Sequence, residues 1–333
     1  MLISIAIPAH NRPAFLLEAV QSIADQTYPN FEVIVVDDGS VPPISRSALE
    51  DVLGQRVTLY RHEVAQGVPK AKNAGINAAH GEVILLLDDD DLLMPDALEC
   101  IHSVFSNHPG IDCLFLGVRP FGPYAEGTVK SRNAALSAVI ENSRPVERDG
   151  IYFFSDSLFG ALLNTVPIDF QRPAARRSMW NIVGGFDESC LFSESAWAIH
   201  ASCVGTIALT RKPITQWRIH GDNFGWPSGI ELDQIRRRQF DNGICAGKEL
   251  LRTFKNEERA WRIRARMIKG RHSGQLFGKA YYLRDKDWLE GIRALLHSFF
   301  LAPRPLHLKL AVKYLIPLRW LEQASASKET DDA

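Results

Sequence analysis

Four consecutive aspartates, Asp88 to Asp91, have the clearest capacity for chemistry in this sequence. They directly follow Val83–Leu87, a run of five apolar residues without alternation. Such a run is typical of a strand that is buried on both faces of a parallel sheet. Adjacent carboxylates raise one another's pKa values unless a cation lies among them, and carboxylate oxygens suit Mg²⁺ or Mn²⁺. The cluster therefore predicts a divalent metal site, with a solvated acidic turn ahead of a helix at Pro95 as the alternative.

Polar loops follow two further expected strands at the same edge of the sheet. Asp37 and Asp38 follow Phe31–Val36, and the loop Pro8–Arg12 follows Leu2–Ile7. Open α/β sheets bind their ligands in the crevice at the carboxyl ends of their strands. The chain contains neither a GxxxxGK[ST] nor a GxGxxG loop to hold phosphates. A metal ion is then the expected counterion of a bound phosphate.

The elements that must position these residues alternate along residues 1–118. Five strands are expected, at Leu2–Ile7, Phe31–Val36, Val57–Tyr60, Val83–Leu87 and Cys113–Val118. Helices are expected between them, with apolar residues at helical spacing from Phe15 and further helices that begin at Gly67 and Pro95. This order predicts parallel βαβ units in three layers. Residues 119–230 are expected to be irregular apart from a helix and two strands, at Glu194–Cys203, Thr206–Leu209 and Ile214–Trp217. Residues 231–300 are expected to be mainly helical.

The composition is that of an ordinary globular protein. The chain has 333 residues, of which 46% are hydrophobic and 23% charged, with a formal net charge of −1. Met1 leads directly into a strand without a basic leader, and no apolar run reaches the roughly 18 residues of a membrane span. Five cysteines are scattered without zinc or redox spacing, which predicts reduced thiols. We therefore expect a cytoplasmic protein.

The C-terminal third differs in charge from the rest of the chain. Residues 251–320 contain 16 Lys/Arg and 5 Asp/Glu. Helical patterns at 289–300 and 306–321 place apolar residues beside lysines, as in helices that lie on an anionic membrane. A helix that packs on the catalytic domain with a solvated basic face is the alternative. No known nucleic-acid-binding motif is present, so nucleic acid is not expected as a partner.

Six segments resemble the family 2 glycosyltransferases of the GT-A fold, in that family's order and over about residues 2–225. They are SIAIPAHNR, VIVVDDGS, GVPKAKNAGI, LLLDDDDLLMP, VGGFDE and RIHGDN. The resemblance implies a three-layer α/β/α nucleotide-diphospho-sugar transferase fold with a mostly parallel central sheet. The expected domains are 1–230, with a nucleotide-binding half at 1–118 and an acceptor-side half at 119–230, then a basic helical extension at 231–323. Residues 324–333 are expected to be a disordered tail.

The resemblance also implies how a nucleotide is bound. Asp38 contacts the base, and the backbone of Pro8 and Ala9 packs on it, with Arg12 in the same loop. Asp89 lies near the ribose. Lys72 stands near the nucleotide where the family usually has arginine, and its ammonium lacks the bidentate fork of a guanidinium.

Metal binding is implied for a second set of residues. Asp90 ligates Mn²⁺ or Mg²⁺, Asp88 supports it, and His220 returns toward the diphosphate and the metal. The alternative for His220 is a solvated loop histidine. The cation stabilises the charge that develops on the leaving diphosphate.

The expected reaction is a single displacement with inversion, in which a base takes the proton of an acceptor hydroxyl. The family usually places this base as the second residue of a Glu-Asp pair, where this chain has Ser195 after Glu194. Glu194 is our expected base, with Asp187 and Glu188 as alternatives. The implied function is that of a metal-dependent hexosyltransferase. It moves a sugar from a nucleoside diphosphate donor, with a UDP-sugar as the first expectation, to a glycan or lipid-linked acceptor in bacterial surface polysaccharide synthesis. A sugar-nucleotide-binding protein without catalysis and a sugar-nucleotide pyrophosphorylase are the alternatives, although the latter's glycine-rich loop is missing.

Overall fold

The computed structural model describes residues 1–190, 193–223, 226–227, 241, 244–245, 247–248, 250 and 259–315. The chain divides into two compact units, Met1–Gly229 and Ile230–Ala333, which we call the N-terminal and C-terminal units. Each unit has its own hydrophobic core.

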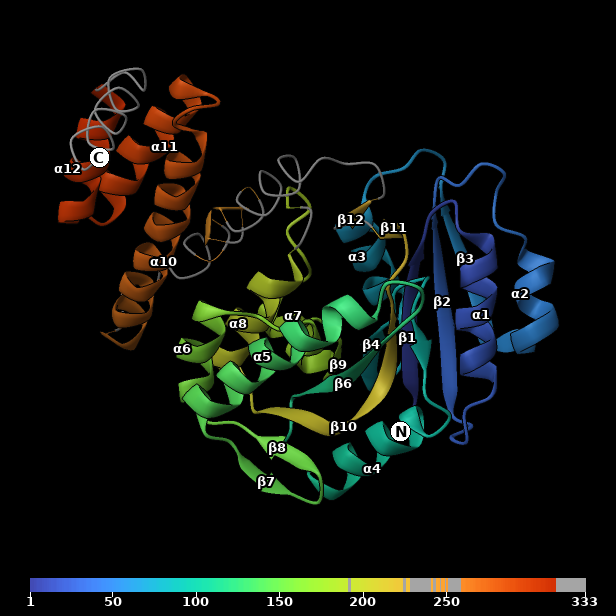
Figure 1. Cartoon of the computed structure of the whole chain (residues 1–333). Helices are drawn as coiled ribbons and strands as arrows, with labels where there is room; N and C mark the ends of the chain where they lie inside the picture. The colour runs from blue at the N-terminus through green and yellow to red at the C-terminus, as the bar shows by residue number, and fades with distance from the viewer. Residues whose placement is uncertain are drawn as a thin grey trace, which may run out of the picture. The chain divides into compact units, whose positions relative to one another are not determined.

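The N-terminal unit is built on a mixed ten-stranded sheet with the order β3-β2-β1-β4-β9-β6-β10-β8-β7, in which β5 also pairs with β10 (Figure 1). The strands are β1 (Ile3–Ala9), β2 (Phe31–Asp38), β3 (Val57–His62), β4 (Val83–Leu86), β5 (Leu92–Leu93), β6 (Cys113–Phe121), β7 (Val146–Arg148), β8 (Ile151–Phe153), β9 (Pro173–Arg176) and β10 (Ile207–Arg218). The first four strands of this order are parallel, whereas β9 runs antiparallel between β4 and β6. β6 and β10 are again parallel. Most strands thus share one direction, and the predicted fold class is confirmed.

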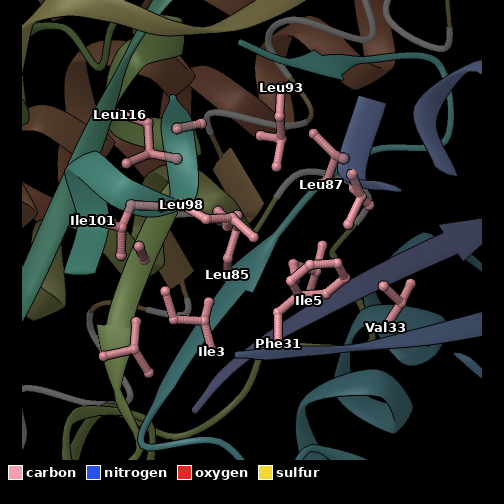
Figure 2. Close-up of a cluster of buried hydrophobic side chains, with 14 of the residues drawn as sticks. Ile3, Ile5, Phe31, Val33, Leu85, Leu87, Leu93, Leu98, Ile101 and Leu116 are labelled. Atoms are coloured by element: carbon pink, nitrogen blue, oxygen red, sulfur yellow. The ribbon is translucent and has the colours of Figure 1, made fainter. Parts of the chain in front are cut away.

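Helices cover both faces of this sheet. They are α1 (Pro13–Ala24), α2 (Arg46–Leu53), α3 (Val68–Ala78), α4 (Ala97–Asn107), α5 (Glu126–Ser143), α6 (Ser157–Asn164), α7 (Arg177–Val183) and α8 (Glu194–Val204). One core cluster joins the apolar faces of α1, α2 and α4 to alternate residues of β1, β2 and β4, such as Ile3, Ile5 and Val33 (Figure 2). Alternate strand residues point to opposite faces, so the other face, with Ala6, is left for α3.

The approach of α3 to the sheet is unusually close. A Cβ at Gly75 would lie 2.9 Å from Ala6 Cβ and 3.6 Å from Val36 Cγ2. The small-residue face expected from the sequence therefore packs directly on β1 and β2. This packing fixes the first turn of α3, with Lys72, beside the carboxyl ends of the strands.

The expectation that residues 119–170 are irregular is wrong. They contain the 18-residue helix α5, the hairpin β7–β8 and the helix α6. Only Val139 and Ser143 are buried in α5, so its sequence carries almost no apolar periodicity. The two strands expected near Thr206 and Trp217 form one strand, β10, whose register shifts on both sides of Pro213.

The C-terminal unit contains α10 (Arg259–Leu283), α11 (Trp288–Leu301) and α12 (Pro305–Leu315), as the helical patterns predict. Leu276, Leu295, Leu310 and Tyr314 lie in its core. The expected helical continuation to Leu321 and the tail from 324 lie outside the described residues. Among the helices that are described, none combines the length and the apolar character that a membrane crossing requires.

Two of the five cysteines differ from the sequence-based expectation. Cys100 and Cys113 carry free thiols, and burial raises the pKa of the Cys113 thiol. Cys190 and Cys245 are disulfide-bonded, so the prediction of reduced thiols is wrong for these two. Spacing along the chain does not determine which sulfur atoms a fold brings within bonding distance.

Candidate active site

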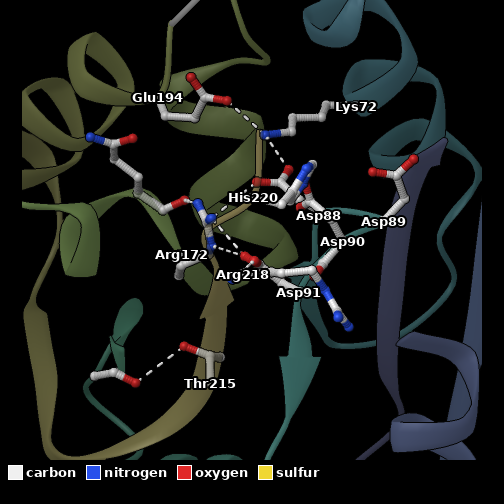
Figure 3. A network of polar contacts seen from close by, with 12 residues as sticks. Lys72, Asp88, Asp89, Asp90, Asp91, Arg172, Glu194, Thr215, Arg218 and His220 are labelled. Carbon is white, nitrogen blue, oxygen red and sulfur yellow. Dashed lines mark hydrogen bonds and ion pairs between the residues drawn. The ribbon is translucent and has the colours of Figure 1, made fainter. Parts of the chain in front are cut away.

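The acidic cluster after β4 is buried rather than solvated. Asp89, Asp90 and Asp91 are buried, and the side chain of Asp88 is 28% exposed. The cluster lies at the carboxyl ends of β1 and β4, beside the end of β10 (Figure 3). Because three of the four carboxylates are buried, the alternative of a solvated acidic turn is contradicted. Buried carboxylates need partners that offset their charge.

Asp91 has a structural role in this cluster. Its Oδ2 accepts hydrogen bonds from Arg172 Nε at 2.9 Å and Arg172 Nη2 at 2.6 Å, and its Oδ1 accepts one from the backbone N–H of Arg218 at 3.0 Å. Asp91 therefore ties the chain after β4 to the segments at β9 and β10. Sequence reasoning missed Arg172, since a single arginine in an irregular stretch gives no signal.

Lys72 connects the acidic cluster to helix α8. Its buried Nζ lies 2.9 Å from Asp88 Oδ1 and donates to Glu194 Oε1 at 2.6 Å. Burial alone lowers the pKa of Lys72, but the Asp88 and Glu194 carboxylates outweigh it and raise that pKa above its usual range. For Asp88 the directions are reversed. Burial alone raises its pKa, but the positive charges of Lys72 and Arg172 outweigh burial and hold that pKa well below its usual range. Lys72 is thus a charged bridge between the two acids.

Asp90 lies between a cation and an imidazole. Its Oδ2 accepts a hydrogen bond from Arg12 Nη1 at 2.9 Å and lies 3.0 Å from His220 Nε2. His220 is buried, and its ring packs against Phe15 with centroids 4.8 Å apart. The alternative of a solvated loop histidine is therefore contradicted. The segment after β10 brings His220 to the cluster across 130 residues of sequence.

Asp89 faces the loop after β1. Its Oδ1 accepts from Arg12 Nη1 at 3.2 Å, and its Oδ2 accepts from the backbone N–H of His10 at 3.3 Å. Burial, and then the neighbouring Asp90 carboxylate, raise the pKa of Asp89 to about 7 against the lowering effect of Arg12. Arg12 is therefore the cation shared by Asp89 and Asp90.

Asp38 connects the loops that follow β1, β2 and β3. Its carboxylate accepts hydrogen bonds from Gln66 N at 2.9 Å and Gly67 N at 2.8 Å, and it lies 2.7 Å from His62 Nδ1. Burial raises its pKa, but these bonds from His62, Gln66 and Gly67 lower it below the usual range. The backbone oxygen of Asp38 lies 2.6 Å from His10 Nδ1. Asp38 thus joins the loops after β1, β2 and β3, beside Pro8 and Ala9 at the end of β1.

Glu194 begins helix α8 and lies against Lys72. Its second oxygen, Oε2, is buried and makes no hydrogen bond with any residue of the described ranges. By contrast, Asp187 Oδ1 accepts from Ser189 N at 2.9 Å within its own turn. Glu188 is exposed and accepts from Asn73 Nδ2 at 3.2 Å. Of the three acids considered as bases, Glu194 joins the cluster through Lys72.

Asn73 fixes the turn that precedes α8. Its Oδ1 accepts from Phe186 N at 2.8 Å, and its Nδ2 donates to Phe186 O at 2.9 Å. Lys72 and Asn73 are adjacent on α3, so one turn of helix holds both the acidic cluster and the turn at Gly184–Glu188. Sequence reasoning included Asn73 in a motif without assigning it a role.

The residues present fit a divalent metal ion in part. Asp90 and His220 offer an oxygen and a nitrogen at one point, and Asp90 Oδ1 makes no hydrogen bond with a described residue. Carboxylate and imidazole are both ligands of divalent ions. Within the described ranges, no group of three or more His, Cys, Asp or Glu side chains converges on one position. An ion held by Asp90 and His220 would need further ligands, and substrate phosphates or water could supply them, as is common for Mg²⁺ and related ions.

The sequence matches known glycosyltransferases. Residues 4–151 match the family described as Glycosyl transferase family 2. An uncharacterized glycosyltransferase of Haemophilus influenzae is 36% identical over 114 residues, which are 34% of this chain and 38% of that protein. Glycosyltransferase GlyG of Streptococcus pneumoniae is 38% identical over 104 residues, 31% of this chain and 34% of that protein. The alignments thus span little more than a third of either relative's length.

Solved structures share the fold. TarS 1–349 of S. aureus in complex with UDP-GlcNAc has a TM-score of 0.61 at 18% identity, covering 91% of this chain and 82% of that one. Mannosyltransferase PcManGT of Pyrobaculum calidifontis, in complex with GDP-Man and Mn²⁺, has a TM-score of 0.52 at 15% identity, covering 93% and 78%.

The fold that these structures share with the chain is the GT-A fold. The family match over residues 4–151 covers less than half of the chain, and this N-terminal stretch is similar to family 2 glycosyltransferases.

Proposed function

We propose that this protein transfers a sugar from a nucleoside diphosphate to an acceptor hydroxyl, with inversion at the anomeric carbon. One observation supports the proposal most. The pair Asp90–His220 and the ion pairs of Lys72 with Glu194 and Asp88 lie together at one edge of the sheet (Figure 3). In this proposal Asp90 and His220 lie where the diphosphate leaves, and Glu194 lies nearby as the general base. The site combines a region for departing negative charge with a carboxylate for proton transfer.

The nucleotide is proposed to lie along the loops after β1 and β2. Pro8, Ala9 and Arg12 supply one side, and Asp38 and Asp89 supply acceptors for base and ribose. Arg12 and Lys72 are the cations nearest to the acidic edge on this side. The UDP-GlcNAc held by TarS supports a uridine nucleotide, although the GDP-Man held by PcManGT shows that this fold accepts another base.

Asp90 and His220 are proposed to hold Mn²⁺ or Mg²⁺, with Asp88 in a supporting position. When bound, the ion neutralises the charge that develops on the departing diphosphate. Asp91 and Arg172 keep the cluster in place, and the ion pairs of Lys72 and Arg172 with Asp88 limit repulsion among the acids. The Mn²⁺ of the PcManGT complex supports a metal requirement.

Glu194 is proposed as the general base. Lys72 holds Oε1, and Oε2, which makes no hydrogen bond with a described residue, is the oxygen proposed to take the acceptor proton. As that proton moves to Oε2, the hydroxyl oxygen bonds to the anomeric carbon and the bond to the diphosphate breaks. The Ser195 hydroxyl, where the family usually has aspartate, cannot serve as a base near neutral pH. We propose a glycan or a lipid-linked sugar of a bacterial surface polysaccharide as the acceptor, and the cytoplasm as the place of reaction.

Donor turnover by the purified full chain tests this proposal. Nucleoside diphosphate release is measured over a panel of nucleotide sugars with Mn²⁺, with Mg²⁺ and with EDTA. We expect metal-dependent release that Glu194→Gln lowers by at least about 100-fold while donor affinity changes little. An isosteric Glu188→Gln change in the exposed turn serves as the control and leaves the rate near wild type.

Ser195 favours one second candidate, a sugar-nucleotide-binding protein without transferase activity. That protein would bind a nucleotide sugar with Mn²⁺ at an affinity like that of an enzyme, yet release no diphosphate with any acceptor. Such a result would contradict the proposed transfer reaction and support the proposed nucleotide-sugar binding site.

A further inference from the structure

The C-terminal unit exposes many large apolar side chains on two of its helices. On α11 these are Leu289, Leu296 and Phe300, and on α12 they are Leu306, Leu308 and Val312. Leu306 and Leu308 are two positions apart and lie on nearly opposite sides of α12, so we call the five residues other than Leu306 the α11–α12 apolar face. Phe300 is 79% exposed and Leu308 is 65% exposed. Exposed apolar residues are common singly, but such a concentration marks a surface with a partner.

The spacing on α11 shows that this exposure is directional. Gly291, Ala294, Leu295 and Ser298 form its buried face. Leu289, Leu296 and Phe300 differ by seven and four positions, which places them together on the opposite side of the helix. α11 packs along α10, and α12 packs on α11. The inward face is therefore already filled, and the outward face is left apolar without a partner in the described residues.

Positive charge borders the apolar face. Arg293 lies four residues after Leu289 on the same side of α11, and Lys309 and Lys313 lie next to Leu308 and Val312 on α12. All three basic side chains are exposed. Residues 259–315 contain 13 Lys/Arg against 3 Asp/Glu. Exposed apolar and exposed basic side chains thus lie next to one another on these two helices.

We propose that the α11–α12 apolar face docks on an anionic lipid membrane. An apolar stripe between lysines and arginines is the pattern of a helix that lies in the interface, with its apolar side in the acyl region and its cations among phosphates. A second copy of this chain would be a poor occupant, because two such faces bring like charges together. This membrane contact does not depend on the transfer reaction.

Vesicle flotation of the full chain tests the proposal. Vesicles of phosphatidylcholine alone are compared with vesicles that contain about one-third phosphatidylglycerol, at low and high salt. The wild-type chain is expected to float with the anionic vesicles at low salt and much less with the neutral ones. The Leu296→Asp, Phe300→Asp double variant is expected to bind at least about tenfold more weakly. The Lys309→Glu, Lys313→Glu variant is expected to lose about 30-fold on anionic vesicles only.

Matched controls use Val41 and Val64, which are 83% and 74% exposed in the N-terminal unit. The Val41→Asp, Val64→Asp variant adds the same charge and is expected to bind vesicles like wild type. All substituted side chains are exposed, so the variants should keep the wild-type melting temperature. Equal flotation of wild type and the apolar double variant would overturn the proposal. Light scattering tests a second copy of the chain as the partner. If the wild type is an oligomer that does not float, and the apolar double variant is a monomer, the face binds a second copy and not a membrane.

Discussion

At the scale of single residues, the acidic edge is a balance between carboxylates and the protein's own cations. Lys72 and Arg172 pair with Asp88, Arg172 pairs with Asp91, and Arg12 serves Asp89 and Asp90. Arg12 therefore neutralises part of the carboxylate charge that a divalent ion at Asp90 would also neutralise. Because the two cations would share the charge of one carboxylate, metal binding at Asp90 is expected to weaken the contact with Arg12.

Replacing Arg12 by glutamine tests this competition. Without nucleotide, Arg12→Gln is expected to bind Mn²⁺ about tenfold more tightly than wild type, because the competing cation is gone. Its metal-free melting temperature should fall, since Asp89 and Asp90 lose their partner. Calorimetric titration with Mn²⁺ measures the first effect, and Arg46→Gln on α2, whose ion pair with Glu50 is exposed, is the control. Unchanged or weaker Mn²⁺ binding by Arg12→Gln would show that Arg12 does not compete with the metal.

The raised pKa of Asp89 predicts a pH dependence of stability. Its folded-state pKa is about 7, whereas an unfolded aspartate has a pKa of about 3.9. Between these pH values the folded chain binds a proton that the unfolded chain does not, so the metal-free protein loses stability as pH rises through this window. Asp89→Asn should therefore stabilise the metal-free protein at pH 8, by on the order of 1 kcal/mol, and change little at pH 4. Chemical denaturation with EDTA at both pH values measures this, and an equal effect at both would contradict it.

At the scale of elements, helix α3 positions the site. Gly75 lets it approach β1 and β2, Lys72 reaches the acidic cluster, and Asn73 holds the turn before α8. The geometry of the reaction thus depends on the contact between one small-residue helix face and the sheet. A change at Gly75 must move the helix, because the contact at Ala6 is with a side chain attached rigidly to the strand.

Gly75→Ala is expected to destabilise the protein by about 1–3 kcal/mol, since the new Cβ overlaps Ala6. Gly127→Ala in helix α5 is the matched control, because nothing lies within 4 Å of its added Cβ. That control should be neutral or up to about 1 kcal/mol more stable. Urea unfolding of both variants measures the difference. If both variants were equally stable, the close approach of α3 would be unimportant.

The elements also show where sequence reasoning succeeds. β1, β2 and β4 have short apolar runs with polar ends, and α1 has apolar residues at helical spacing, so these elements and the acidic edge could be predicted. Helix α5 could not, because it is largely exposed and has only Val139 and Ser143 buried. Arg172 and the antiparallel β9 were also missed. Their place depends on contacts between residues far apart in the chain, such as the bond from Arg172 to Asp91 across 81 positions.

At the scale of the whole molecule, the chain contains a unit of the GT-A fold and a basic helical unit with exposed apolar side chains. The two proposals are separable, because donor chemistry depends on residues of the N-terminal unit and membrane docking on α11 and α12. The predicted division into a nucleotide-binding half at 1–118 and an acceptor-side half at 119–230 stays a prediction. A variant of the α11–α12 apolar face should keep full turnover with a soluble acceptor.

The most direct test of the central claim is calorimetric titration of the full chain with UDP, in Mn²⁺ and in EDTA, for wild type and Asp90→Ala. The wild-type chain should bind UDP at least about tenfold more tightly with Mn²⁺ than with EDTA, because an ion held by Asp90 and His220 would offset the negative charge of the diphosphate. In Asp90→Ala this gain should vanish, with the EDTA affinity retained to show that the fold is intact. An undiminished Mn²⁺-dependent gain in Asp90→Ala would contradict the assignment of the acidic edge as the metal and diphosphate site.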